Sequence, residues 1–536
     1  MQTGVILLTS SASKEADRLS TSLQAKGIPV LQYSNDDVDE MPGAITGFLA
    51  NNRLESVVVS NTSQESPPDS LSRTIESTGL GRHAVSWIPL ATLTGEQTSE
   101  RTANAADAIV LVNVARLQRA DYIRNIVSRM VAGSSRLSRR ELFRSIPNVL
   151  RVESDIPIVL ADRCRDRSKS CNYCIKACPV NAVSAATTAV AINDRVCIEC
   201  GACARDCPIG ALQSASISDG QMIAMLEALA SKRSETSNRA LVLTCPIGFE
   251  RLLNEGRGGK RLDAGIVPVQ IPCVSFIGSV HYVWAASLGV ALATVCPDIS
   301  CKKVVGMFPL YQHVSSSKRL LRGLREHAIA SVHHFGLHAN DSIVDIVSQA
   351  LSTTSAVGVS AKLSGSYRHE LIVDAIRGLQ IGSSGNVEVS EDGTLPFFDL
   401  RVDEARCSFC EACQRDCPDH AIEFTKSDEG LTFMFDPSLC GGCTICEKIC
   451  PEKAITVSRL KNFSPLLERK KTAKAQDENA KCENCGAVLM SRRSLTALKK
   501  KLSDQGVTEA TIKALDLCTR CKQNALIRPL GRHMQI

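Results

Sequence analysis

The feature that most constrains this chain is a pair of neighbouring cysteine runs, "CSFCEACQRDCP" and "CGGCTICEKICP". The runs begin at Cys407 and Cys440, and each has the spacing C-x2-C-x2-C-x3-C-P. A C-x2-C-x2-C loop can wrap three thiolates around one face of a cubane iron-sulfur cluster, while the fourth cysteine reaches the neighbouring cluster. The tandem repeat therefore predicts two [4Fe-4S] clusters.

Two such runs in tandem are typical of bacterial two-cluster ferredoxins, in which each cluster takes three ligands from one run and one from the other. One cluster is predicted to be held by Cys407, Cys410, Cys413 and Cys450. The other is predicted to be held by Cys440, Cys443, Cys446 and Cys417. We expect residues 396–460 to form this ferredoxin domain.

An earlier segment, residues 156–220, carries a second pair of runs, "CRDRSKSCNYCIKACP" and "CIECGACARDCP". The first of them has Ser168 where a thiolate is expected, but Cys164 lies four residues upstream and can supply the ligand from a longer loop. The predicted [4Fe-4S] ligand sets are Cys164, Cys171, Cys174 and Cys207, and then Cys197, Cys200, Cys203 and Cys178. If Cys164 is only structural, the first site is open or holds three irons.

Four further cysteines lie between the two ferredoxin segments: Cys245, Cys273, Cys296 and Cys301. Four thiolates are what a rhombic [2Fe-2S] cluster requires, although buried, inert thiols remain an alternative.

The stretch from Cys273 to Cys296 contains no Asp, Glu, Lys or Arg, and on hydropathy alone it fits a transmembrane helix. A spanning helix would hold its ends about 30 Å apart, so the two cysteines could not share one cluster. Its glycines and serines favour a loop, a helix near "SVHYVWAASLG" and a buried strand "VALATV". We therefore expect no membrane span.

Residues 238–355 resemble the delta subunit of methyl-viologen-reducing hydrogenase in "VPVQIPC", in the Ala-Ser-Leu-Gly helix end, in the apolar strand entering C-x4-C, and in "SSSKRLLRGLREHAIASVHHFGL". The resemblance implies a [2Fe-2S] cluster that passes electrons to heterodisulfide reductase. Members of that family have extra cysteines near the position of Cys245. The histidines at 333, 334 and 338 fall where a strand enters the core, and we interpret them as packing or surface residues.

Residues 1–120 alternate apolar runs such as "GVILLTS" and "SVVVSN" with helix-like segments, which is typical of a small α/β domain. From "NRLESVVVSN" to "VARLQRA" the chain resembles the N-terminal domain of the flavin-holding subunit of heterodisulfide reductase. That family tends to have a cysteine where this chain has Thr62, so we expect a docking domain without a cluster. The chain has no complete glycine-rich phosphate loop, and we expect it to bind no flavin or nicotinamide.

The C-terminal end, residues 481–536, carries "CENCG" and "CTRC" after a charged linker at 461–480. Two CxxC turns make a closed, tetrahedral site typical of structural zinc, with another iron-sulfur site as the alternative. Its predicted ligands are Cys482, Cys485, Cys518 and Cys521. The end is basic but nearly free of aromatics, which favours a solvated or partner-facing surface over nucleic-acid binding.

Length and cysteine distribution set the class of protein. A chain of 536 residues is too long for one core. None of its 24 cysteines precedes Cys164 and most lie in short clusters, which indicates metal ligands in a reducing, cytoplasmic setting and not disulfides. The formal net charge of +6 counts every cysteine as neutral, so metal-bound thiolates would make the loaded protein acidic.

The predicted fold class is multidomain α/β and α+β. It comprises an N-terminal α/β domain, two ferredoxin-like domains each with two [4Fe-4S] clusters, an α/β [2Fe-2S] domain between them, and a small zinc-binding C-terminal domain. The predicted connections are a helical linker at 121–155 and a linker at 356–395, with the central domain at 235–355.

Taken together, the cysteine patterns predict four [4Fe-4S] clusters, one [2Fe-2S] cluster and one zinc ion, and no catalytic residue. We expect an electron-transfer subunit of a heterodisulfide-reductase-like or hydrogenase-linked complex, with a flavoprotein and reductase or hydrogenase subunits as partners. One alternative is a redox-responsive regulator that binds nucleic acid through the zinc tail. Another is an enzyme that binds substrate at the iron of the irregular first cluster.

Overall fold

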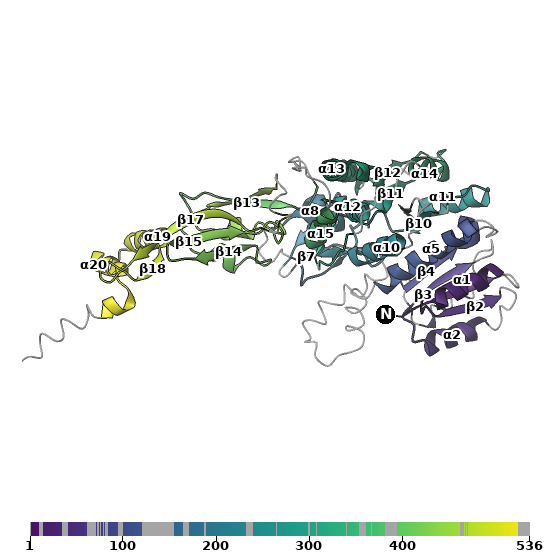
Figure 1. Ribbon diagram of the computed structural model, residues 1–536, viewed down its shortest axis with the longest axis horizontal. Helices are drawn as coiled ribbons and strands as arrows, with labels where there is room; N and C mark the ends of the chain where they lie inside the picture. The colour runs from purple at the N-terminus through teal and green to yellow at the C-terminus, as the bar shows by residue number, and fades with distance from the viewer. Residues whose placement is uncertain are drawn as a thin grey trace, which may run out of the picture. The chain divides into compact units, whose positions relative to one another are not determined.

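The computed structural model describes most of the chain. The described residues are 2–9, 14–34, 41–61, parts of 71–94, 100–119, 155–164, 171–186, 189–231, 239–297 without 264, 301–352 without 307 and 339, 361–380 without 366, 394–460, 466, 468 and 470–523. They form two compact units, unit 1 made mainly of residues 1–395 and unit 2 mainly of residues 396–536. Figure 1 labels the helices and strands of both units. The mixed α/β, multidomain class is confirmed, while the expected helical linker at 121–155 lies outside the described residues except for Asp155.

Unit 1 begins with a parallel four-stranded sheet in the order β2-β1-β3-β4. Its strands are β1 (Thr3–Thr9), β2 (Val30–Ser34), β3 (Ser56–Asn61) and β4 (Val85–Pro89). Its helices are α1 (Lys14–Gln24), α2 (Met41–Asn51), α4 (Leu90–Thr94) and α5 (Glu100–Gln118). Every residue of β1 is buried, as expected for a parallel strand covered on both faces.

A second parallel sheet follows in unit 1, in the order β10-β9-β11-β12. Its strands are β9 (Ala240–Thr244), β10 (Ile266–Gln270), β11 (Ala291–Cys296) and β12 (Val332–Gly336). Its helices are α11 (Pro246–Arg257), α12 (Ser279–Ser287), α13 (Phe308–Leu324), α14 (Ile343–Ser352) and α15 (Arg368–Gln380). Because the strands are parallel, the carboxyl ends of all four lie at one edge of the sheet.

The uncharged stretch from Cys273 to Cys296 folds inside this domain. It contains the nine-residue helix α12, buried at every position, and the strand β11, so both predicted elements are confirmed. The Tyr282 hydroxyl lies 2.6 Å from Thr294 Oγ1, which satisfies a buried polar group. No helix in the described part of the chain is long and apolar enough to cross a membrane.

Helix α15 lies within residues 356–395, for which the sequence pattern predicted a linker. Leu371, Ile372, Ala375, Ile376 and Leu379 are buried, and α15 contacts α12. Their spacing of i, i+1, i+4, i+5 and i+8 is that of an amphipathic helix, which the Ser- and Gly-rich flanks obscured. This part of the expected linker therefore belongs to the core of unit 1.

The first ferredoxin segment is also part of unit 1. Its elements are β5 (Ile158–Val159), α8 (Tyr173–Ala177), β6 (Val183–Ala185), β7 (Val190–Ile192), α9 (Ala202–Asp206) and β8 (Leu212–Gln213), followed by α10 (Asp219–Ser231). The outer strands β5 and β8 pair antiparallel, and so do the inner strands β6 and β7.

Unit 2 repeats this order of elements. It contains β13 (Phe398–Val402), α16 (Ala412–Arg415), β14 (Ile422–Lys426), β15 (Gly430–Phe435), α17 (Ile445–Ile449) and β16 (Ile455–Arg459). Again the outer strands, β13 and β16, pair antiparallel, as do the inner strands β14 and β15. The two cysteine-rich segments thus share one topology.

The C-terminal part of unit 2 holds β17 (Thr472–Lys481), β18 (Val488–Ser491), α19 (Arg492–Asp504) and α20 (Glu509–Lys513). Strand β17 pairs with β15 and β18, although it falls almost entirely within the expected charged linker at 461–480. Only Ala475 and Ala480 of this strand are buried. Small apolar residues on an otherwise polar strand gave too weak an alternation to be recognised from sequence.

Gly442 offers a test of the cysteine loop in unit 2. It has φ +69°, and a Cβ atom there would lie 2.3 Å from the Phe398 ring. We expect Gly442→Ala to lower the free energy of unfolding of the anaerobic, iron-loaded chain by about 3 kcal/mol, because it adds overpacking to left-handed strain. Gly506→Ala is the control, since Gly506 has φ +75° but nothing within 4 Å, and should cost only about 1 kcal/mol. Equal losses in denaturant unfolding would contradict the role of the Phe398 contact.

Candidate iron-sulfur and metal centres

The three regular cysteine runs share one backbone conformation. In each, left-handed residues follow the first cysteine by two positions and the second cysteine by one: Glu199 and Gly201, Phe409 and Glu411, Gly442 and Thr444. In the irregular run the position after Cys171 is Asn172, with φ −136°. The irregular cysteine spacing at Ser168 is therefore accompanied by a backbone conformation that differs from that of the three regular loops.

The fourth cysteine of each run is followed by a second shared turn. The residue three positions after it has positive φ in all four runs, at Asn181, Gly210, His420 and Lys453. In three runs the fourth sulfur accepts a backbone N–H from four residues on: Ala182 to Cys178 at 3.1 Å, Ala211 to Cys207 at 3.2 Å and Ala454 to Cys450 at 3.3 Å. Such N–H···S bonds stabilise a thiolate and help to set the potential of a bound cluster.

In unit 2 the thiols gather in the predicted sets. A cavity is lined by Cys417, Cys440, Cys443 and Cys446. In the other set, burial raises the pKa of Cys407, and the nearby thiols of Cys450 and Cys410 raise it further. Burial with Cys407 and Cys410 close by raises the pKa of Cys413 to about 12. The fourth cysteine of each run thus lies beside the other run's thiols.

In the first ferredoxin segment, the fourth cysteine of the first run lies beside the thiols of the second run. Burial raises the pKa of Cys200 to about 11, and Cys178 adds to the increase there, as it does for Cys197 and Cys203. The Cys174 thiol also raises the pKa of Cys203, so the two predicted ligand sets lie next to each other. Cys164 is buried and Cys171 half-buried, but the residues between them lie outside the described part of the chain. Ligation by Cys164 therefore stays a prediction.

The four central cysteines line one cavity of about 190 Å³ in unit 1. Cys245 follows β9, Cys273 follows β10, and Cys296 ends β11, so three of them stand at the carboxyl ends of adjacent parallel strands. This edge of a parallel sheet is where such folds bind ligands. Each of these cysteines directly follows an apolar run, and this signal in the sequence could have placed them at one edge.

Cys245 occupies the N-terminal cap of α11. Burial raises the pKa of its thiol, while the backbone N–H groups of Gly248 and Ile247 lower it and the Cys273 and Cys301 thiols raise it again. The N–H groups are arranged to stabilise a thiolate, but mutual repulsion and burial oppose one. Bound iron would offset that repulsion, so the donor set fits a four-thiolate iron site.

The central cavity adjoins the first ferredoxin segment. Cys273 is close enough to Cys200 to raise the pKa of its thiol, after the larger effect of burial. A Cβ on Gly306, beside the cavity-lining Lys303, would lie 2.8 Å from Cys200 Sγ. Lys303 Nζ is also 3.5 Å from Glu199 Oε2, in the loop of the second run. The two thiol groups are thus neighbours within unit 1.

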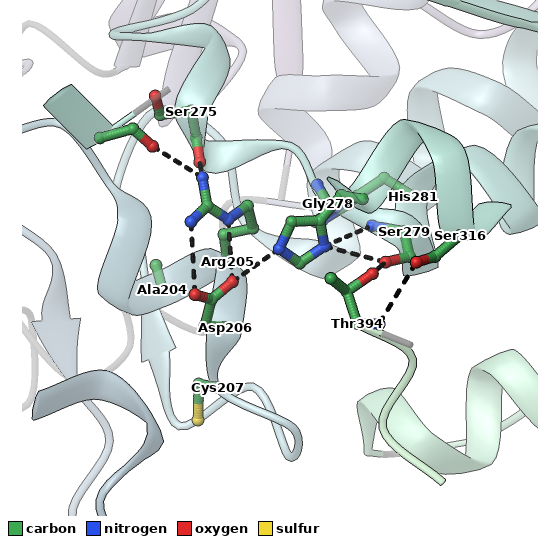
Figure 2. A network of polar contacts seen from close by, with 12 residues as sticks. Ala204, Arg205, Asp206, Cys207, Ser275, Gly278, Ser279, His281, Ser316 and Thr394 are labelled. Carbon is green, nitrogen blue, oxygen red and sulfur yellow. Dashed lines mark hydrogen bonds and ion pairs between the residues drawn. The ribbon is translucent and has the colours of Figure 1, made fainter. Parts of the chain in front are cut away.

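A buried polar network fixes helix α9 between Cys203 and Cys207 (Figure 2). Asp206 accepts from Arg205 Nε and from His313 Nε2, both at 2.8 Å. His313 Nδ1 accepts the backbone N–H of Ser279 at 3.2 Å, which places its proton on Nε2. Burial raises the pKa of Asp206, but the hydrogen bonds from His313 and Arg205 and the charge of Arg205 hold it well below its usual range. Nothing in the sequence around His313 indicated this role.

The histidines of β12 lie in the strand expected for them. The ring of His333 stacks on that of Phe335, and His334 Nδ1 is 2.8 Å from Thr294 Oγ1. Within the part of the chain that the structure describes, they belong to no cluster of potential metal ligands.

The tail cysteines meet at one point in unit 2. The sulfurs of Cys482, Cys485, Cys518 and Cys521 all lie within 4.8 Å of one another, and those of Cys485 and Cys518 are 3.6 Å apart. Zinc–sulfur bonds of about 2.3 Å in a tetrahedron place sulfurs about 3.8 Å apart, so the group fits a single zinc ion. The backbone N–H of Cys518 donates to Cys482 Sγ at 3.3 Å and lowers the pKa of that thiol.

Comparison with known proteins identifies one part of the chain. Residues 406–454 match the family of 4Fe-4S dicluster domains. No curated protein matches the chain. Unit 2 therefore contains an iron-sulfur domain for at least one [4Fe-4S] cluster, and this chemistry suggests electron transfer.

The crossed pairing of ligands in unit 2 can be tested by counting iron. We expect Cys450→Ser and Cys407→Ser each to lose about four iron atoms per chain, and the double variant to lose no more, because both cysteines serve one cluster. Combining Cys450→Ser with Cys440→Ser should remove about eight. Iron and sulfide analysis of anaerobically reconstituted protein measures this, and additive loss in the Cys407 and Cys450 pair would refute the pairing.

Proposed function

We propose that this chain is an iron-sulfur electron-transfer subunit of a heterodisulfide-reductase-like or hydrogenase-linked redox complex. In it, electrons pass between a flavin or metal site of a partner and a reductase. The observation that carries the proposal is the adjacency of separate thiol groups within unit 1. The Cys174 thiol raises the pKa of Cys203, and the Cys273 thiol raises the pKa of Cys200. Because thiols of neighbouring sites lie this close together, iron-sulfur clusters bound at those sites would be close enough for rapid electron exchange.

The proposed cofactors are four [4Fe-4S] clusters, one [2Fe-2S] cluster in the central cavity and one zinc ion in the tail. When bound, the clusters supply one-electron redox chemistry. The chain's own residues hold the thiolates in fixed loops and donate N–H groups to three of the four fourth sulfurs. The shared topology of residues 156–220 and the matched segment 406–454 supports ferredoxin-type sites in both.

The partners follow from the two resemblances. A flavoprotein and reductase or hydrogenase subunits would supply and consume the electrons, since this chain offers a series of redox sites and, in its described residues, no arrangement that we assign to substrate chemistry. Anaerobic purification from the native cell through a small tag, with flavin and metal analysis of the same sample, tests this. A co-purifying flavoprotein and reductase would support the proposal, and a lone, fully loaded chain would count against it.

The central site has its own test. We expect Cys273→Ser to remove about two iron atoms per chain and the corresponding [2Fe-2S] resonance, because Cys273 is one of four thiols around the cavity. Ser275→Ala is the control, since Ser275 is equally buried two positions away and offers no thiol. Electron paramagnetic resonance of the reduced protein measures both. An unchanged spectrum in Cys273→Ser would exclude a cluster in this cavity.

The tail should hold its metal independently of the relay. We expect Cys485→Ser to lose one zinc ion per chain while the iron content stays unchanged, because the four tail sulfurs form a separate group. Cys245→Ser is the reciprocal control and should retain zinc. Elemental analysis measures both metals. Loss of iron in place of zinc from Cys485→Ser would assign the tail an iron-sulfur site.

A further inference from the structure

Arg368 reaches the first ferredoxin segment from a distant part of the sequence. It begins helix α15, its residue is only 3% exposed, and its guanidinium enters the turn that follows α9. There Nη1 donates to the carbonyl oxygens of Ala204 at 2.8 Å, Arg205 at 3.1 Å and Cys207 at 2.8 Å. The positive charge is therefore held directly against the backbone of a predicted cluster ligand.

Asp219 holds the other side of the guanidinium. Arg368 Nε and Nη2 donate to its two carboxylate oxygens at 3.0 and 2.7 Å, which is a bidentate ion pair. Gln213 Nε2 donates to the same carboxylate at 2.9 Å, and His281 Nε2 lies 3.3 Å from it. The hydrogen bonds and the charge of Arg368 keep the pKa of Asp219 well below its usual range, despite burial, which raises it.

His281 does not add a further charge beside the Arg368–Asp219 ion pair. Its Nδ1 accepts the backbone N–H of Gly278 at 3.0 Å, which leaves the proton on Nε2, facing Asp219. Burial lowers the pKa of the imidazole, so the ring is neutral near pH 7. Of the Arg368–Asp219 pair, the guanidinium bonds to the backbone carbonyl of Cys207, and Asp219 binds the guanidinium.

Such an ion pair is costly to bury and is seldom retained for stability alone. A positive charge beside a cluster favours the reduced form, because one-electron reduction adds a negative charge and no atoms. Arg205, a buried cation within α9 itself, pairs with the neighbouring carboxylate of Asp206.

We propose that Arg368 is a positioning residue that fixes the Cys207 turn and raises the reduction potential of the cluster bound there, with Asp219 moderating its charge. This inference rests on the proposed function, since it requires a cluster at Cys207. It assigns a redox role to α15, a helix outside every cysteine run.

The test is a redox titration of the anaerobically reconstituted full chain, monitored by electron paramagnetic resonance. Cys207→Ser first identifies the signal of this cluster as the one that it alters. In Arg368→Gln we expect that signal alone to move to lower potential. In Asp219→Asn, where the positive charge is no longer moderated, we expect it to move to higher potential. Arg368→Lys keeps the charge and should restore a value near the native one.

Arg239→Gln is the matched control. Arg239 is also buried and also donates to backbone carbonyls, those of Leu229 and Ala230 at the end of α10. Its replacement by Gln should leave every reduction potential unchanged. An unmoved signal in Arg368→Gln, or equal shifts of all signals, would overturn the inference. If Arg368→Gln does not load iron, Asp219→Asn decides: an upward shift supports the inference and no shift overturns it. If Cys207→Ser alters no signal, the proposed function fails at this site instead.

Discussion

The constraint on which this structure depends is the cost of bringing several thiols together away from water. Burial raises the pKa of almost every clustered cysteine for which a shift is resolved outside the tail, and neighbouring thiols raise it further. Such groups repel one another as thiolates, so only a cation at their centre makes the ionised set favourable. The loops, strand ends and buried ion pairs around them serve to hold that set in place.

Two different backbone devices solve this problem. In the ferredoxin segments, left-handed residues such as Glu199 and Phe409 turn short loops, and the fourth cysteine of each run is predicted to bind the other run's cluster. In the central domain, a parallel sheet places Cys245 and Cys273 at neighbouring strand ends, although they are far apart in sequence. The first arrangement is local in sequence and the second depends on the topology of the sheet. In unit 1 the two adjoin where Cys273 lies near Cys200.

This difference explains what the sequence could predict. Local cysteine spacing was enough to predict the dicluster segment that the family comparison matches at residues 406–454. The helix and the strand between Cys273 and Cys296 could be predicted from the composition of that stretch. Sequence patterns did not predict α15 and β17, whose apolar residues are few or small and lie beside polar flanks. They also gave no indication of the roles of His313 and Arg368, because the partners of these residues are distant in sequence and no spacing rule links them.

The two ferredoxin segments show how far a shared motif can diverge. Both contain Arg-Asp-Cys-Pro at the end of a run. In unit 1 the Arg205 side chain is fully buried and Asp206 is 24% exposed, whereas in unit 2 the Arg415 and Asp416 side chains are 73% and 41% exposed. Water screens the second pair, and the first acts in a low dielectric. Because cluster potentials depend on nearby charge and solvent exposure, identical motifs can hold clusters of different potential. In the proposed relay such a difference would come, at these two motifs, from the surrounding fold and not from the motif itself.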